Sequence, residues 1–258
     1  FERREKMQLT YNVRNTHRAV GTRFSSEITR LYGMKGLSEG HVHVRLRGSA
    51  GQSLGAFLCQ GITLEVFGDA NDYVGKGLSG GTIIVRPTVS SPLTSQQNSI
   101  IGNTVLYGAT SGRLLAAGQA GERFAVRNSG AHVVVEGCGS NGLEYMTGGM
   151  AVILGKVGSN FGAGMTGGMA FLLDTEGDFA KMANPDSIVW QRLDSAYWED
   201  QLKSLITAHA QATDSAWSQS LLEDWDRRRG EFWQICPKEM LTRLSQPLSD
   251  HEVLEAAE

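Results

Sequence analysis

The feature that most constrains this chain is a glycine pattern that recurs at a nearly fixed spacing. The chain has 258 residues, with 32 glycines but only 5 prolines. With the last glycine of the string GKGLSGG as an anchor, equivalent glycines follow at gaps of 31, 18, 19 and 19 residues: Gly81, Gly112, Gly130, Gly149 and Gly168. The long gap contains a Ser-, Gln- and Pro-rich stretch from Pro87 to Asn103, which we interpret as a loop inserted into one repeat.

The repeat extends to the residues around each anchor. A small polar residue stands two positions before it: Ser79, Thr110, Asn128, Thr147 and Thr166. An apolar residue stands three positions after it: Ile84, Leu115, Val133, Val152 and Phe171. A period near 19 is too short for helix-pair repeats or propeller blades. It suits one coil of a parallel β-helix, in which each coil buries the face of the next.

In such a fold, each coil returns the chain about 4.8 Å above itself, so that strands pair in parallel. Glycine suits the tight bends because it tolerates positive φ and close backbone approach. Hydroxyl side chains can bond along the stack or to the turn backbone. The sequence therefore predicts nine structural corner residues: Gly81, Gly112, Gly130, Gly149, Gly168, Ser79, Thr110, Thr147 and Thr166.

The fold class predicted is all-β, a single-stranded parallel β-helix of about seven coils over residues 41–174. Residues 1–40 are predicted as a short N-terminal α/β connecting segment, with a strand at Thr10–Arg14 and a helix at Glu27–Tyr32. Residues 175–258 are predicted as a linker and a helical C-terminal tail, with Ser195 as an N-cap and a last helix opening at Pro237. We expect the tail to cover one end or side of the solenoid.

Composition excludes several classes of protein. The net charge of −3 argues against non-specific nucleic-acid binding, which needs a surplus of Lys and Arg. The three cysteines, Cys59, Cys138 and Cys236, give no disulfide framework and indicate a reducing compartment, here the cytoplasm. The sequence contains no stretch of eighteen apolar residues, so no membrane partner is predicted.

Two motifs resemble functional signatures but are better explained by the repeat. The pattern GxGxxG occurs three times, at Gly75, Gly137 and Gly162, and a dinucleotide site needs a helix after it, whereas β-rich runs follow the first and last matches. GxSxG occurs at Gly77–Gly81, but Ser79 belongs to the hydroxyl column rather than to a nucleophile elbow. No catalytic or cofactor-binding residue is therefore predicted.

Two groups have the side chains that metal ions prefer. His41 and His43 share a strand face but lack a third ligand, so that a solvated pair is the preferred interpretation. Asp69, Asn71 and Asp72 lack the spacing of a calcium loop and are interpreted as a turn. No metal site is predicted.

Arg14, Asn15, Arg18 and Arg23 precede the solenoid and would join it to any upstream domain. We predict them as a candidate domain interface, because arginine is enriched at interfaces. The alternative is a simple solvated surface.

Several long strings carry a resemblance to a known family: NTHRAVGTRFSSEITRLYG (15–33), GSAGQSLGAF (48–57), GDANDYVGKGLSGG (68–81), AGERFAVRNSGA (120–131), EYMTGG (144–149) and GMTGGMAFLLD (164–174). They closely resemble the C-terminal GXGXG domain of the glutamate synthase large subunit. The resemblance implies a right-handed parallel β-helix that serves as a structural and interface element.

The resemblance also implies a parent enzyme that makes two glutamates from glutamine and 2-oxoglutarate, with FMN, an iron–sulfur cluster and electrons from NADPH, NADH or ferredoxin. None of those working parts matches this chain, since residue 1 is Phe rather than a nucleophilic cysteine and no cysteine cluster is present. The chain by itself is expected to be inactive and free of cofactors. Its implied partners are the other domains of the large subunit and the small subunit.

One position departs from the family, because Leu143 stands where members often have cysteine, and it fits a packing role. Two alternatives remain: a stand-alone β-helix subunit of another redox complex, similar to the one in formylmethanofuran dehydrogenase, and a small-molecule module at the glycine corners. The string NTHRAVGTR favours the glutamate synthase interpretation.

Overall fold

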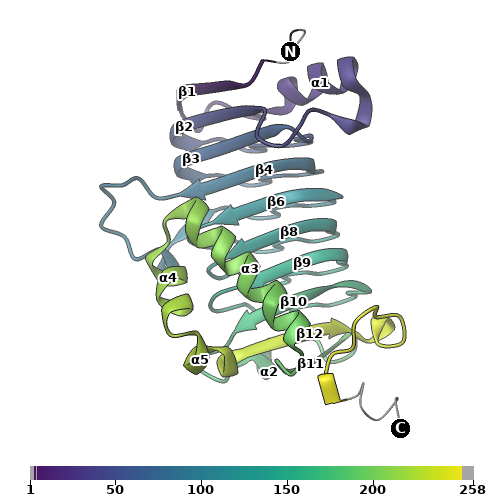
Figure 1. Ribbon diagram of the computed structural model, residues 1–258. Helices are drawn as coiled ribbons and strands as arrows, with labels where there is room; N and C mark the ends of the chain where they lie inside the picture. Colours follow the sequence, from purple (N-terminus) through teal and green to yellow (C-terminus); the bar gives the residue numbers. More distant parts are fainter. Residues whose placement is uncertain (1–2, 4, 252–258) are drawn as a thin grey trace.

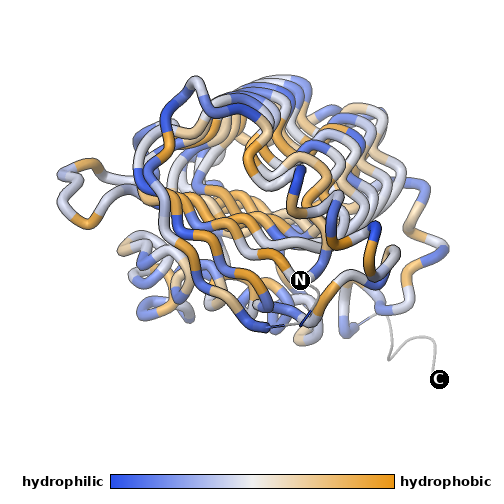
Figure 2. The backbone as a smooth tube through the Cα atoms, turned by 90° about the horizontal axis from the view of Figure 1, so that it is seen from above, coloured by the Kyte–Doolittle hydropathy of each residue, from blue (hydrophilic) through white to orange (hydrophobic). Residues whose placement is uncertain are grey.

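The protein is dominated by one 12-stranded, mostly parallel sheet. The computed structural model describes residue 3 and residues 5–251. Eight strands follow one another in parallel: β1 (Met7–Val13), β2 (Val42–Ala50), β3 (Ile62–Ala70), β4 (Ser79–Arg86), β6 (Ser111–Ala116), β8 (Ser129–Val135), β9 (Thr147–Ile153) and β10 (Gly167–Leu173). Figure 1 shows these strands stacked, and the view of Figure 2 shows successive turns of the chain following the same path.

The predicted inserted loop leaves the stack after β4. It projects from the body of the molecule in both views and holds a 3-10 turn, η2 (Ser95–Gln97). Within the predicted range lies β5 (Ser99–Ile101), which pairs with β3 and with β7 (Gln119–Ala120). The insertion therefore rejoins the sheet before the next coil begins.

Strand register confirms the repeat in most coils and corrects it in one. Ile84 pairs with Leu115, and Val152 pairs with Phe171, as the predicted columns require. Leu115, however, pairs with Val134 rather than with Val133. Because His132 pairs with both Arg113 and Met150, the residue beside Gly112 and Gly149 is Ala131, not Gly130. Glycine spacing places this column one residue too early here, because alanine occupies the equivalent position in this coil.

Between strands, each coil returns through a segment in which every second residue has a left-handed backbone. The positions with positive φ are Ser53, Gly55 and Phe57; Tyr73, Gly75 and Gly77; Thr104, Leu106 and Gly108; Arg123, Ala125 and Arg127; Asn141, Leu143 and Tyr145; and Asn160, Gly162 and Gly164. The Gly75 N–H donates to Leu54 O in the coil before at 2.8 Å, and the Gly77 N–H donates to Tyr107 O in the coil after at 2.9 Å. The return segments are thus hydrogen-bonded to both neighbours without being strands.

Most of these left-handed positions are not glycine. Among the described residues, twelve of the fourteen non-glycine residues with positive φ lie in these segments. A left-handed residue with a side chain costs roughly 1–2 kcal/mol. Such conformations persist only where the surroundings determine them. The inter-coil hydrogen bonds and the packed interior supply that constraint here.

The interior of the solenoid is one continuous apolar core. Alternate residues of each strand point inward and stack on their equivalents in the next coil, as Val44, Leu64 and Ile83 do. Leu54, Phe124 and Phe161 fill the side of the return segments, and all three are fully buried. Leu143 is also fully buried in this core, which confirms its predicted packing role.

A second apolar cluster lies on the outside of the sheet, under the tail. Residues of β6, β8, β9 and β10 that point outward pack against Trp198, Leu202 and Ile206 of α3 (Ala196–Thr213). In Figure 1, α3 crosses these strands diagonally. Burying such a side chain contributes about 1.5–3 kcal/mol. The prediction that the tail covers one side is therefore confirmed.

The C-terminal region is not wholly helical, which corrects the prediction of a linker and helical tail. β12 (Phe232–Pro237) pairs antiparallel with β10, and β11 (Ile188–Arg192) pairs antiparallel with β12. Pro237 ends a strand, and the 3-10 turn η4 (Lys238–Met240) stands where a helix opening at Pro237 was expected, so the prediction of that helix is wrong. The alternating run EFWQICP pairs with the edge of β10 that would otherwise be open. This pairing outweighs the preference for a helix to begin at a proline.

The remaining helices match the sequence more closely. α1 (Thr22–Tyr32) ends at Gly33 as predicted but begins five residues before the predicted Glu27, after Gly21, and η1 (Gly33–Lys35) follows it. α3 and α4 (Ala216–Glu223) are separated at Asp214, which has a left-handed backbone, and Ser215 caps α4 by accepting from the Ser218 N–H. Short elements complete the chain: α2 (Phe179–Met182), α5 (Trp225–Arg228) and η3 (Arg229–Glu231).

Two glycines with nearly the same left-handed backbone test how much the interior restricts the return segments. Gly55 has φ +67° and a Cβ there would lie 2.4 Å from Ile83 Cδ1, whereas Gly108 has φ +65° and open space around it. We expect Gly108→Ala to lower the free energy of unfolding by about 1 kcal/mol through backbone strain alone. Gly55→Ala should cost about 1–3 kcal/mol more, because it also overpacks the core.

Urea unfolding of both variants beside the unaltered protein measures the difference. Equal losses in the two variants would contradict a role for interior packing.

Candidate domain interface

The predicted interface residues lie at the N-terminal end of the stack. Arg14, Asn15 and Arg18 occupy the connection from β1 to α1, and Arg23 lies in the first turn of α1. All four are exposed, and within the described part of the chain the three arginines make no ion pair. The structure thus places these four exposed side chains between the end of β1 and the first turn of α1.

The N-terminal segment has a charge opposite to that of the rest of the chain. Residues 1–35 contain eight Lys and Arg but three Asp and Glu, whereas the whole chain has a net charge of −3. The remaining residues therefore carry a net charge of −8. A concentrated positive end attracts an acidic surface and repels another basic one.

The predicted corner residues all lie where strands begin. Gly112, Gly149 and Gly168 have positive φ, and a Cβ at Gly81 or Gly130 would approach the preceding coil within about 3 Å. The hydroxyls of Ser79 and Thr110 donate to the carbonyl oxygens of Leu58 and Leu78 in the coil before, at 3.5 and 3.4 Å. For Thr147 and Thr166 the contact to the preceding coil is made by the backbone N–H, to Asn128 O and Met146 O.

The nucleotide-like and elbow-like motifs lack the geometry that their chemistry needs. Gly75 and Gly77 belong to a return segment, and strand β4 follows them rather than a helix. Their N–H groups already donate to neighbouring coils and cannot cradle a phosphate. Ser79 begins the same strand, so it has no strand-turn-helix setting.

The two metal-like groups are also accounted for by structure. His41 is buried rather than solvated, and His43 is half-buried with its Nε2 2.9 Å from Glu65 Oε2, which corrects the interpretation of a solvated pair. Asp72 Oδ1 accepts from the Asn103 N–H at 2.8 Å, and Asn71 Oδ1 accepts from the Asp72 N–H at 2.8 Å. These oxygens serve turn backbone, as predicted.

The cysteines are separate buried thiols. Cys59, Cys138 and Cys236 are all unpaired and buried. Burial raises the pKa of Cys138 to about 12 and that of Cys236 to about 11. Since a metal or a nucleophilic reaction requires the thiolate, these thiols fit neither role. Across residue 3 and residues 5–251, no group of three or more His, Cys, Asp or Glu side chains could hold a metal ion.

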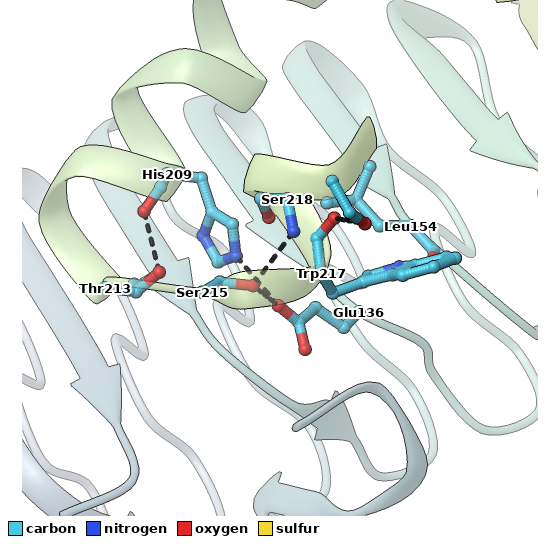
Figure 3. Close-up of polar contacts among 8 residues, drawn as sticks. Glu136, Leu154, His209, Thr213, Ser215, Trp217 and Ser218 are labelled. Carbon is cyan, nitrogen blue, oxygen red and sulfur yellow. Dashed lines mark hydrogen bonds and ion pairs between the residues drawn. The ribbon is translucent and has the colours of Figure 1, made fainter. Parts of the chain in front are cut away.

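A buried polar cluster between the sheet and the tail had no signal in the sequence (Figure 3). Glu136, just after β8, and His209 of α3 are fully buried, and Ser215 is nearly so. His209 Nε2 lies 3.3 Å from Glu136 Oε1, and the Ser215 hydroxyl donates to the same oxygen. His209 and Ser215 lie 73 and 79 positions after Glu136, which no local motif could reveal.

This cluster has the residue types of a hydrolase triad but not its arrangement. In a triad the histidine stands between the serine and the carboxylate and takes the serine proton. Here the Ser215 hydroxyl donates to the carboxylate, and His209 binds the same oxygen from another side. A groove of about 600 Å³ beside the cluster is lined by Ser215 but by neither Glu136 nor His209. The cluster therefore fixes the tail on the sheet rather than reacting with a substrate.

Neighbouring contacts strengthen this attachment. Trp217 Nε1 donates to Leu154 O at 2.8 Å, and Arg86 at the end of β4 forms an ion pair with Asp214. None of the helices in residue 3 and residues 5–251 has the length and apolar character that crossing a bilayer requires.

Comparison with known proteins gives a single family. A family model described as the GXGXG motif matches residues 1–238. Over 96% of its length the chain is 65% identical to the glutamate synthase (NADPH) large chain of Azospirillum brasilense, of which it spans 16%. It is 51% identical over 88% of its length to ferredoxin-dependent glutamate synthase 2 of Synechocystis and 46% identical over 92% of its length to glutamate synthase (NADH) of Schizosaccharomyces pombe. The chain spans 15% and 11% of those two relatives.

The buried cluster makes a measurable prediction. Glu136→Ala should lower the free energy of unfolding by about 2–4 kcal/mol, because it leaves the buried partners of the carboxylate unsatisfied. Ser215→Ala should cost about 1–2 kcal/mol, because it also removes the cap of α4. Since both changes act on one oxygen, the double variant should lose less than the sum by at least about 0.5 kcal/mol.

Urea unfolding of the four proteins completes this cycle, with Ser220→Ala on the exposed side of α4 as the control. Strict additivity would show that Ser215 and Glu136 are not coupled.

Proposed function

Because this chain belongs to the GXGXG motif family of glutamate synthase large chains, we propose that it is an architectural and interface domain of such an enzyme. The observation that carries the proposal is 65% identity over 96% of the chain to one large chain, of which it spans only 16%. A domain related to so small a share of a larger enzyme can act by holding the other parts in register. The solenoid suits that role, because stacked coils form a stiff rod.

The proposal includes the finer fold, a right-handed parallel β-helix of about seven coils in residues 41–174. Seven strands from β2 to β10 follow one another on the parallel path of the sheet within that range. Right-handed connection is the rule for parallel strands in general.

The whole enzyme would make two L-glutamates from L-glutamine and 2-oxoglutarate, with electrons from NADPH, NADH or ferredoxin. The three kinds of electron donor occur in the names of the relatives, and this chain is similar to all three kinds. We therefore propose that the choice of donor depends on other parts of the enzyme.

The cofactors of the parent enzyme, FMN and an iron–sulfur cluster, do not fit the described residues of this chain. An iron–sulfur cluster needs several cysteine thiolates at one site, and Cys59, Cys138 and Cys236 are buried in separate places with raised pKa values. Each string that resembles a phosphate loop has a glycine whose N–H donates to a neighbouring coil: Gly75, Gly139 and Gly162. We propose that both cofactors belong to other domains.

The N-terminal end is our proposed contact with those domains. Arg14, Arg18 and Arg23 are exposed there without ion pairs among the described residues, together with Asn15. Partners in this proposal are the other domains of the large chain and the small subunit, in the cytoplasm, where thiols stay reduced. No observation favours the alternative of a stand-alone β-helix subunit similar to the one in formylmethanofuran dehydrogenase.

An absorbance spectrum and an assay test the non-catalytic role. The purified 258-residue chain should show no flavin or iron–sulfur absorbance between about 300 and 600 nm and no glutamine-dependent oxidation of NADPH, NADH or reduced ferredoxin. The intact large chain is the positive control. A coloured chain, or one that turns over, would sink the proposal.

The interface role predicts a specific effect of charge. In the intact large chain, Arg18→Glu should make the junction between this domain and its neighbours about two- to fivefold more sensitive to limited proteolysis, because a favourable charge contact becomes a repulsion. Arg243→Glu, also exposed and without an ion pair among the described residues, is the matched control. Equal sensitivity in the two variants would argue against this end as the interface.

A further inference from the structure

The first strand of the sheet has one free edge. All seven residues of β1 pair with β2 in unbroken parallel register, and no other described strand lies beyond β1. The Met7 N–H donates to His41 O, towards the β2 side. Because backbone groups alternate along a strand, the N–H groups of Gln8, Thr10 and Asn12 point to the free edge.

This edge lacks the usual protection against pairing. The sequence of β1, MQLTYNV, has no charge, no proline and no glycine, and its register shows no bulge. Natural edge strands are commonly protected by lysine, proline, bulges or a covering segment. A neutral seven-residue edge of this kind is suited to receive another strand.

β1 carries apolar side chains on the face that continues the interior of the solenoid. Met7 and Tyr11 pair with Val42 and Leu46, which face the apolar interior. Val42 and Leu46 are 2% and 3% exposed, whereas Met7 and Tyr11 are 48% and 53% exposed. Val13, on the same face, is 5% exposed, so the interior column continues into β1 and is open to solvent at Met7 and Tyr11.

The opposite end of the sheet is covered by antiparallel strands. There β12 turns the pairing antiparallel and β11 follows it. Gln191 Nε2 on β11 donates to Leu248 O at 3.0 Å, which brings the last described segment beside that strand. Within residue 3 and residues 5–251, the chain thus covers one end of its sheet with its own tail and adds no strand at the other end.

We infer that the free edge of β1 receives a further strand from an acidic segment of another domain of the large chain. This inference rests on the proposed function. The added strand would pair with the backbone of Gln8, Thr10 and Asn12 and place apolar side chains over Met7 and Tyr11. An acidic sequence is expected for this strand, because Arg14 directly follows β1 and, like Arg18 and Arg23, makes no ion pair among the described residues.

Charge decides between an acidic partner and a second copy of this chain. Edge-to-edge pairing of two copies would bring together two N-terminal segments, each with eight Lys and Arg against three Asp and Glu. Like charges in that position oppose association. An acidic strand removes this repulsion and buries the same apolar side chains.

Hydrogen exchange resolved to single amides tests the inference in the 258-residue chain and in the intact large chain. In the 258-residue chain, the amides of Met7, Leu9 and Tyr11 should be protected by β2, while those of Gln8, Thr10 and Asn12 exchange fast. In the intact large chain the exchange of the second set should slow by about a hundredfold or more.

Thr10→Pro in the intact chain should restore fast exchange at Gln8 and Asn12, because proline removes an edge donor yet is tolerated on edge strands. Thr10→Val keeps that donor and is the matched control.

Equal, fast exchange of the second set in both proteins would overturn the inference. Protection already present in the 258-residue chain would also overturn it, and a dependence on concentration would identify a second copy as the occupant. Limited proteolysis of the same intact protein separates the two proposals. A domain that is released independently of its neighbours contradicts the proposed function, whereas a docked domain with fast edge amides contradicts only the added strand.

Discussion

The whole structure depends on hydrogen bonding between coils through return segments that alternate left-handed residues. A backbone of that kind is costly for residues such as Leu106 and Ala125, and neither would hold it in isolation. Stacking changes the balance, because each segment bonds to the coils before and after it and its apolar side chains fill one interior. Glycine occupies six of the eighteen left-handed positions in these segments, where this conformation costs least. The N–H groups of Gly75 and Gly77 are bonded to neighbouring coils and are not free to cradle a phosphate.

Different contacts stabilise the solenoid and hold the C-terminal tail on it. One core fills the inside of the solenoid, and a second cluster lies outside it under α3. Where the sheet meets the tail, a fully buried carboxylate, Glu136, accepts from Ser215 and contacts His209. Burying such a group is costly unless its partners are correctly placed, so it favours one position of the tail over others. Apolar contacts hold the tail down, and the polar contact determines where it lies.

Sequence pattern predicted the elements that depend on neighbours in the repeat, and it failed where distant segments meet. The coil period, the separation of α3 from α4 and the corner positions follow from local spacing. Glycine spacing does not reveal Ala131, because alanine takes the equivalent position in that coil. The strand Phe232–Pro237 was missed because its partner, β10, lies about sixty residues earlier. The cluster of Glu136 and His209 joins residues 73 positions apart, which no periodicity can indicate. The arginine-rich end was visible from the sequence, but the open edge beside it required the strand pairing.

The docking of α3 has a consequence for how such a solenoid can change in length. Trp198 of α3 contacts Phe171 of β10, and Asp214, the residue after α3, pairs with Arg86 at the end of β4, so the helix bridges several coils. Neighbouring strands are about 4.8 Å apart, and one helical turn rises about 5.4 Å. Adding or removing one coil would therefore displace one of these contacts by nearly a full turn of α3. The length of α3 therefore limits the number of coils beneath it, because a coil can be added or removed only if the helix lengthens or shortens by a similar distance.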